Sequence, residues 1–213
     1  TVYGLRYAYR ISGMKEMRVV LPSIERPKKL PVVLSRNEVR QLLKAPKLLK
    51  HRLVLAMLYG CGLRNFELCN LQLKDLDLER MMLHIRQGKG RKDRYVPLCA
   101  MQVRGLRKYI SAERPVTWCF NGNDSKGGPV ALSARGVQWI VKEARKHSGI
   151  QKEVTTHSLR HSYATHLLEM GLDIMSVKDL LGHADIQTTL TYLHVAQLGR
   201  QRPFSPLERL YDK

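Results

Sequence analysis

A small set of side chains in this sequence is suited to binding and cleaving a phosphodiester. The set combines arginine, lysine, histidine and tyrosine: Arg64, Lys89, His157, Arg160, His183 and Tyr192. An arginine guanidinium presents a planar fork of donors to two phosphate oxygens and keeps its charge. Two such groups would stabilise the extra negative charge of a pentacoordinate phosphorus. The pattern therefore predicts phosphoryl-transfer chemistry.

Tyr192 is the candidate nucleophile. A tyrosine can form a covalent phosphotyrosine and so divide one displacement into two steps. Because the phenol has a reference pKa of about 10, neighbouring arginines or His183 must prepare it for attack. Lys89 could protonate the leaving 5′-oxygen, and Glu67 could orient an arginine or a base. No metal or other cofactor is expected, because guanidiniums supply the positive charge and the sequence has no carboxylate cluster.

The segment that ends at Tyr192 is expected to form three short helices. The first covers 157–170 and the second covers 174–181, and each ends before a glycine. The third is expected to begin near Asp185 and to carry Tyr192. Since residues three and four apart are neighbours on a helix, this hairpin would bring histidines, an arginine and the tyrosine together.

Two further histidines in this segment are interpreted as structural. His161 and His166 fit packing or capping positions better than catalytic ones. His157 and His161 are four residues apart and could hold a metal together, but no third ligand is visible. A metal site is therefore not expected.

The upstream elements must position Arg64 and Lys89. We expect helices at 36–44, 51–60, 63–71, 100–112 and 134–147, strands at 76–78, 82–85, 95–98 and 117–120, and a loop at 121–129. Ser35 and Glu38 form a capping-box signature, and the helix at 51–60 is apolar nearly all round, as in a core helix. The fold class predicted is α+β, mainly helical with a small antiparallel sheet.

A basic hairpin loop is predicted between the strands at 82–85 and 95–98. Its tip is expected to carry Lys89, Arg91, Lys92 and Arg94. The three residues Arg91, Lys92 and Arg94 are candidate contacts to a DNA backbone, since phosphates are bound by exposed cations. A solvated basic loop is the alternative, and Lys92 competes with Lys89 as the functional lysine.

The charge of the chain points to a polyanionic partner. The 213 residues include 37 Lys and Arg against 18 Asp and Glu, a formal net charge of +19. Nucleic acid is the first candidate and an anionic membrane surface is the second. No apolar run approaches the roughly 18 residues of a membrane span, and no secretory signal is visible. The four cysteines are far apart and are expected to be reduced thiols, so the predicted location is the cytoplasm.

The motifs together resemble those of the tyrosine recombinases, or phage integrase family. The matching stretches follow the order and spacing of that family: Gly62-Leu63-Arg64-Asn65-Phe66-Glu67-Leu68, residues 88–94, residues 157–161, residues 180–183, and Tyr192. The resemblance covers about residues 30–192. It implies catalytic roles for Arg64, Lys89, His157, Arg160, His183 and Tyr192, with Glu67 as a supporting acid. Asn65 and Phe66 depart from the family pattern, which affects packing beside Arg64.

The resemblance also implies a fold, an activity and partners. Residues 1–30 would be the end of a core-binding domain and a proline-rich linker, and residues 31–213 a tyrosine recombinase catalytic domain with a C-terminal tail. The expected activity is site-specific recombination of double-stranded DNA in a bacterial cytoplasm, through a 3′-phosphotyrosine. The enzyme would form dimers to tetramers on DNA, with tails exchanged between protomers or folded back. Type IB topoisomerase-like relaxation and a catalytically silent DNA-binding module are the alternatives.

Overall fold

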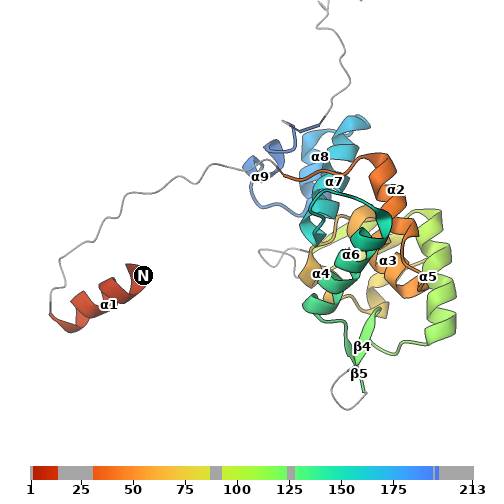
Figure 1. Cartoon of the computed structure of the whole chain (residues 1–213), viewed down its shortest axis with the longest axis horizontal. Helices are drawn as coiled ribbons and strands as arrows, with labels where there is room; N and C mark the ends of the chain where they lie inside the picture. Colours follow the sequence, from red (N-terminus) through yellow and green to blue (C-terminus); the bar gives the residue numbers. More distant parts are fainter. Residues whose placement is uncertain (1, 14–30, 87–92, 124–127, 194, 197–213) are drawn as a thin grey trace, which may run out of the picture.

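The computed structural model describes residues 2–13, 31–86, 93–123, 128–193 and 195–196 (Figure 1). Its helices are α1 Val2–Ile11, α2 Arg36–Lys44, α3 Leu49–Gly60, α4 Asn65–Cys69, the 3₁₀ turn η1 Leu73–Asp75, α5 Ala100–Glu113, α6 Ala134–Ser148, α7 Thr156–Glu169, α8 Ile174–Leu181 and α9 Gln187–Leu190. Its strands are β1 Leu76–Asp77, β2 Met82–Ile85, β3 Arg94–Pro97, β4 Asn121–Asn123 and β5 Pro129–Ala131. The predicted α+β class is confirmed.

Helix α3 is the centre of the main core. It buries residues on nearly every face, among them Val54, Leu55 and Leu58, and packs against α5, α7, α2 and α6. Figure 1 shows α3 enclosed by these helices. Such an all-round apolar helix gains stability only when neighbours cover all its faces. The position predicted for the 51–60 segment is thus correct, although the helix begins two residues earlier, at Leu49.

A second, smaller hydrophobic cluster lies between α7 and α8. Its buried members are Tyr163, Ala164, Leu168, Val177, Leu181 and Tyr192. We call it the α7–α8 cluster. The buried residues of the main core instead lie between Leu34 and Leu159 in the sequence, and they include Leu159 on the inward face of α7. Helix α7 therefore contributes to both clusters.

The predicted helix ends are formed by the expected caps. Ser35 and Glu38 make both hydrogen bonds of a capping box at α2. Asp173 accepts a hydrogen bond from the backbone at the start of α8, and Gly182 ends that helix with φ 61°. A left-handed residue at this position turns the chain sharply, so His183 leaves the axis of α8.

The three-stranded sheet has the order β1-β2-β3, and both pairings are antiparallel. Ile85 at the end of β2 pairs with Arg94 at the start of β3. The beginning of β3 lies beside α8, which places the base of this hairpin next to the segment that leads to Tyr192. The predicted loop tip at 87–92 lies outside the described residues.

Three predictions of local structure are wrong. The stretch 117–120 forms only one bridge, between Gln72 and Trp118, and the stretch 121–129, expected to be a loop, begins and ends in the paired strands β4 and β5. Its Gly, Asn and Asp content was assigned to a loop, but its first residues and Pro129 belong to the two antiparallel strands of a hairpin. The third helix of the C-terminal segment also ends at Leu190, so Tyr192 follows α9 instead of lying on it.

The four cysteines are free, as predicted: Cys61, Cys69 and Cys119 are buried and Cys99 is exposed. In the described part of the chain, no helix is both long and apolar enough to cross a bilayer. The predicted linker up to residue 30 lies almost wholly outside the described residues, as does the tail beyond 196.

Candidate active site

The turn between α3 and α4 places Arg64 at the start of α4. Gly62 has φ 58°, and a Cβ built on it would lie 2.4 Å from a ring carbon of Tyr163. Only glycine allows this approach of the turn to α7. Arg64 then forms the N-cap of α4, as predicted, and its side chain is 21% exposed.

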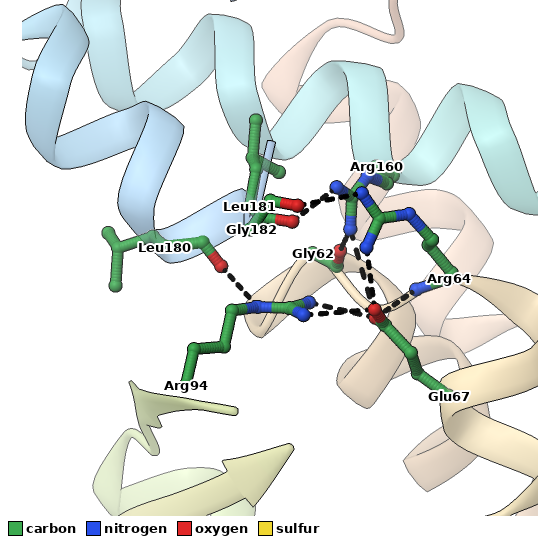
Figure 2. A network of polar contacts seen from close by, with 8 residues as sticks. All are labelled: Gly62, Arg64, Glu67, Arg94, Arg160, Leu180, Leu181 and Gly182. Carbon is green, nitrogen blue, oxygen red and sulfur yellow. Dashed lines mark hydrogen bonds and ion pairs between the residues drawn. The ribbon is translucent and has the colours of Figure 1, made fainter. Parts of the chain in front are cut away.

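Glu67 is the point at which three arginines meet (Figure 2). Its carboxylate accepts hydrogen bonds from the backbone N–H and Nη1 of Arg64 at 2.8 and 2.7 Å. Arg94 adds a bidentate pair at 2.9 and 2.8 Å, and Nη1 of Arg160 lies 3.8 Å away. The side chain of Glu67 is only 4% exposed. The structure thus places Glu67 against the arginines, three residues after Arg64.

The charge state of Glu67 follows from these contacts. Burial by itself raises the pKa of a carboxyl group, but the hydrogen bonds and charge of Arg94, the backbone N–H of Arg64 and the charge of Arg160 outweigh it. Together they lower the pKa of Glu67 to about 2. The carboxylate is therefore ionised at neutral pH and faces three positive charges.

The carboxyl end of α8 binds the same three arginines (Figure 2). The carbonyls of residues 180–182 accept, in chain order, from Arg94 Nε at 2.8 Å, Arg160 Nη2 at 2.6 Å and Arg64 Nη2 at 3.1 Å. The last carbonyls of a helix lack partners within the helix and carry partial negative charge. Here the guanidiniums of Arg94, Arg160 and Arg64 donate hydrogen bonds to these carbonyls. The cluster as a whole keeps an excess of positive charge, which suits an anionic ligand.

Arg160 is the most buried of the three arginines. Its residue is 3% exposed, and Nη1 donates to the carbonyl of Gly62 at 2.5 Å. Burial and the charge of Arg64 lower the pKa of Arg160 to about 10, although Glu67 acts in the opposite direction. The guanidinium is still charged at neutral pH. It links α7 to the glycine turn and to the end of α8.

Tyr192 lies in a buried position between two histidines. The residue is 3% exposed, and its hydroxyl is 3.0 Å from Nδ1 of His161. The ring of His183 is stacked 6.2 Å from the tyrosine ring at an interplanar angle of 18°. Burial raises the pKa of Tyr192, while the charges of Arg160 and Arg64 act to lower it. The charges of the two arginines therefore act on Tyr192, but burial outweighs them and the phenol keeps its proton.

The two predicted catalytic histidines occupy different positions. His183 follows the left-handed Gly182, and its Nδ1 is 2.9 Å from the hydroxyl of Thr189. His157 is exposed in the first turn of α7, with its ring 6.3 Å from that of His161. The structure thus brings Arg64, Glu67, Arg160, His183 and Tyr192 into one region. Lys89, Arg91 and Lys92 lie outside the described residues.

The placement of Arg94 at the tip of the hairpin is wrong. Arg94 is the first residue of β3, its side chain is 8% exposed, and its guanidinium is bound to Glu67. A signal for this exists in the sequence. Residues two apart on a strand point to the same face, and Arg94 shares a face with the buried Val96. The DNA-contacting role assigned to it does not fit this inward position.

Sequence reasoning also missed the partner of the candidate nucleophile. His161 was interpreted as a packing residue, yet it is hydrogen-bonded to the hydroxyl of Tyr192. Its spacing of four from His157 placed it on the same face of α7 as the site. Within the described ranges, no three His, Cys, Asp or Glu side chains are grouped to hold a metal ion.

Replacement of Glu67 by glutamine is expected to destabilise the fold. Removal of one partner from a buried charge cluster typically costs about 3–5 kcal/mol of unfolding free energy, and here three guanidiniums lose their counter-charge. Because the folded-state pKa of Glu67 is lowered to about 2, its contribution is complete above the unfolded pKa and is lost as pH falls through 2. The difference between wild type and E67Q should therefore shrink below a pH of about 4.5.

Urea denaturation followed by circular dichroism at pH 7, 4.5 and 3 measures this difference. Glu153→Gln is the control, because Glu153 is 81% exposed in its pair with Arg145 and exposed pairs contribute at most about 1 kcal/mol. Equal, small effects of the two substitutions would show that Glu67 does not hold the cluster together.

Known proteins match the part of the chain that contains these site residues. A sequence model described as the phage integrase family matches residues 32–198. Tyrosine recombinase XerA of Thermococcus onnurineus (strain NA1) is 39% identical over 196 residues, which are 91% of this chain and 69% of that protein. The putative integrase/recombinase y4eF of Sinorhizobium fredii (strain NBRC 101917 / NGR234) is 40% identical over 211 residues, or 97% of this chain and 83% of the relative.

Solved structures agree with the sequence matches. The crystal structure of XerA recombinase covers 96% of this chain and 75% of its own, with a TM-score of 0.75 and 29% identity. The XerH site-specific recombinase bound to palindromic difH substrate, in a post-cleavage complex, covers 86% of this chain and 55% of its own, with a TM-score of 0.70 and 27% identity.

Proposed function

The chain belongs to the phage integrase family, and on that premise we propose that it cuts and rejoins DNA strands through Tyr192. The hydroxyl of Tyr192 attacks the scissile phosphate, forms a 3′-phosphotyrosine and releases a 5′-hydroxyl. That hydroxyl, or one from a partner strand, then attacks the phosphotyrosine in the reverse direction. The bond energy is kept in the phosphotyrosine, so the cycle requires no nucleotide cofactor.

The observation that carries this proposal is the convergence of Tyr192 with two arginines whose charge reaches its hydroxyl. Arg160 and Arg64 each use two guanidinium nitrogens on protein oxygens. A guanidinium has five N–H donors, so each retains donors for phosphate oxygens. In this position the two guanidiniums stabilise the charge of the phosphorane and hold the phosphorus atom next to the hydroxyl of Tyr192.

The remaining predicted residues receive roles in the same cycle. Lys89 protonates the leaving 5′-oxygen. His157 and His183 assist catalysis beside the phosphate and the tyrosine ring. Arg91 and Lys92 bind the DNA backbone beside the cut. Arg94 is not among these contacts, because its guanidinium is occupied by Glu67.

The partner proposed is a double-stranded recombination site, which agrees with the net charge of +19. The protein acts on it in the cytoplasm of a bacterial cell. Synapsis of two sites requires a dimer or tetramer on DNA, and residues 198–213 dock on a neighbouring protomer. Residues 1–30 are the end of a second DNA-binding domain and a linker, and residues 31–213 are the catalytic domain with its tail.

Covalent capture on DNA tests the proposal. Because the target sequence is not known, the protein is incubated with a randomised duplex library, denatured in SDS, and the retained DNA is sequenced. A nicked duplex of the recovered sequence then lets the short 5′-hydroxyl strand leave, so that the adduct accumulates. We expect a label on the 5′ end of the cut strand to stay with the protein and peptide mapping to locate the adduct at Tyr192.

Two outcomes would reject the proposed chemistry. One is an adduct through a 5′-phosphate, with a free 3′-hydroxyl on the other fragment, which would mean the opposite polarity of cleavage. The other is DNA binding without any adduct on nicked sites, which would indicate a silent DNA-binding module. Relaxation of a single plasmid without recombinant products would favour the topoisomerase reading of the same chemistry.

A further inference from the structure

The hydroxyl of Tyr192 has a defined partner in the resting protein. Its oxygen is 3.0 Å from Nδ1 of His161, and the two rings lie 5.5 Å apart at an angle of 50°. His161 lies on α7, directly after Arg160 and one turn after His157. The nucleophile is thus bound to a nitrogen base whose own helix also carries the most buried arginine of the site.

The direction of this hydrogen bond follows from the two acidities. Burial raises the pKa of Tyr192, so the phenol keeps its proton. Burial, followed by the charges of His157 and Arg160, lowers the pKa of His161 to about 4. The imidazole is therefore neutral at pH 7, and its Nδ1 accepts from the phenol while the proton of the ring is on Nε2.

Other bases near Tyr192 are held differently. The ring of His183 stacks on the face of the tyrosine ring, and its Nδ1 is bonded to Thr189. His157 is exposed, and its ring lies 6.3 Å from that of His161. The carboxylate of Glu67 is engaged by arginines. Geometry therefore favours His161 over these groups as the acceptor of the phenolic proton.

We propose that His161 takes the proton of Tyr192 as the tyrosine attacks DNA and returns it during religation. This inference rests on the proposed function. During cleavage the Tyr192 Oη–P bond forms, the P–O5′ bond breaks, and the phenolic proton moves to Nδ1 of His161. The 5′-oxygen receives its proton from the general acid of that mechanism. Charge and protons balance, and religation reverses each transfer.

A bound phosphate makes this transfer easier than it is in the resting protein. The phosphate charge offsets that of Arg160, which is one cause of the low pKa of His161. A nearby negative charge also favours the imidazolium. The base therefore stays unprotonated until the substrate arrives and gains proton affinity when it is bound.

Substitution of His161 by asparagine tests whether His161 accepts a proton or only positions Tyr192. The asparagine side chain can place a hydrogen-bonding group near the former Nδ1 but cannot take a proton. General base catalysis contributes about 10²–10⁴-fold, so single-turnover adduct formation by H161N at pH 7 should fall by that factor. His161→Ala should fall similarly, and religation from the isolated covalent complex should slow by the same factor.

The pH profile gives a readout that a purely positioning role would not change. The groups that face His161 are His157 and Arg160 on its own helix and Tyr192 after α9, with His183 behind the tyrosine and Arg64 from α4. Without the base, hydroxide must remove the phenolic proton. The H161N rate should then rise about tenfold per pH unit between pH 7 and 9, more steeply than that of wild type.

The same helix offers a matched control. His166 is 5% exposed, and its Nδ1 is 2.9 Å from the hydroxyl of Tyr59. His166→Asn breaks an equivalent histidine–tyrosine bond that does not involve the three arginines of the site. It should therefore leave the adduct rate unchanged. A near-wild-type rate and an unchanged pH profile in folded H161N would overturn the inference, as would faster cleavage. If wild type forms no adduct, the proposed function fails instead.

Discussion

Tyr192→Phe is expected to abolish the SDS-resistant DNA adduct. The substitution removes the oxygen that forms the bond to phosphorus but keeps the ring between His161 and His183. Loss of one hydrogen bond costs about 1 kcal/mol, so the fold should remain. Removal of a nucleophile lowers the rate by at least roughly 10⁴-fold, which places adduct formation below detection on a nicked duplex.

The matched control for this substitution is Tyr163→Phe. Tyr163 is also buried in the α7–α8 cluster, and burial raises its pKa to about 12. Its ring carbons pack against the Gly62 turn and are kept in Y163F, so this variant should form the adduct at the wild-type rate. An undiminished adduct in Y192F would refute the assignment of the nucleophile.

Arg160→Ala is expected to reduce cleavage by about 10³-fold or more while leaving most non-specific DNA binding. Arginines that stabilise phosphoryl transfer contribute about 10³–10⁵-fold, whereas binding depends on many phosphate contacts. A cost in stability is also expected. The carbonyls of Gly62 and Leu181 lose their donors, and each unpaired buried group costs about 1–3 kcal/mol.

Arg160→Lys distinguishes the two effects. Lysine keeps the positive charge but not the fork that joins two carbonyls to a phosphate. We expect R160K to bind DNA as wild type does and still to cleave slowly in single-turnover assays. Arg36→Ala, at a side chain that is 54% exposed, serves as the charge-matched control and should cleave normally. Loss of all DNA binding in R160A would instead identify Arg160 as a folding residue.

The sequence contained most of the site because its motifs are local. The family was predicted correctly from the series of motifs, and the helix ends at Ser35, Asp173 and Gly182 were predicted correctly from capping residues and a glycine. The position of Arg64 at the start of α4 followed from the same signals. Each of these features depends on residues a few positions apart, which sequence periodicity can report.

The errors concern contacts between distant segments. Arg94 was assigned to a solvent-exposed tip, but it pairs with Glu67, 27 positions earlier. His161 was assigned to packing, but its partner is Tyr192, 31 positions later. A basic residue in a polar loop and a histidine on a helix have ordinary local explanations. Only the arrangement of β3, α4 and α7 around the end of α8 shows that these two residues belong to the site.

The proposed nucleophile lies outside the main hydrophobic core. Tyr192 is buried in the small α7–α8 cluster, while the main core begins at Leu34 and includes α3. Cooperative units with few buried contacts open at a lower free energy than the global fold. In amide hydrogen exchange, residues after Gly182 should accordingly lose protection at lower denaturant than α3. On the proposed function, such an opening would move Tyr192 relative to the DNA while the central helix α3 stays folded.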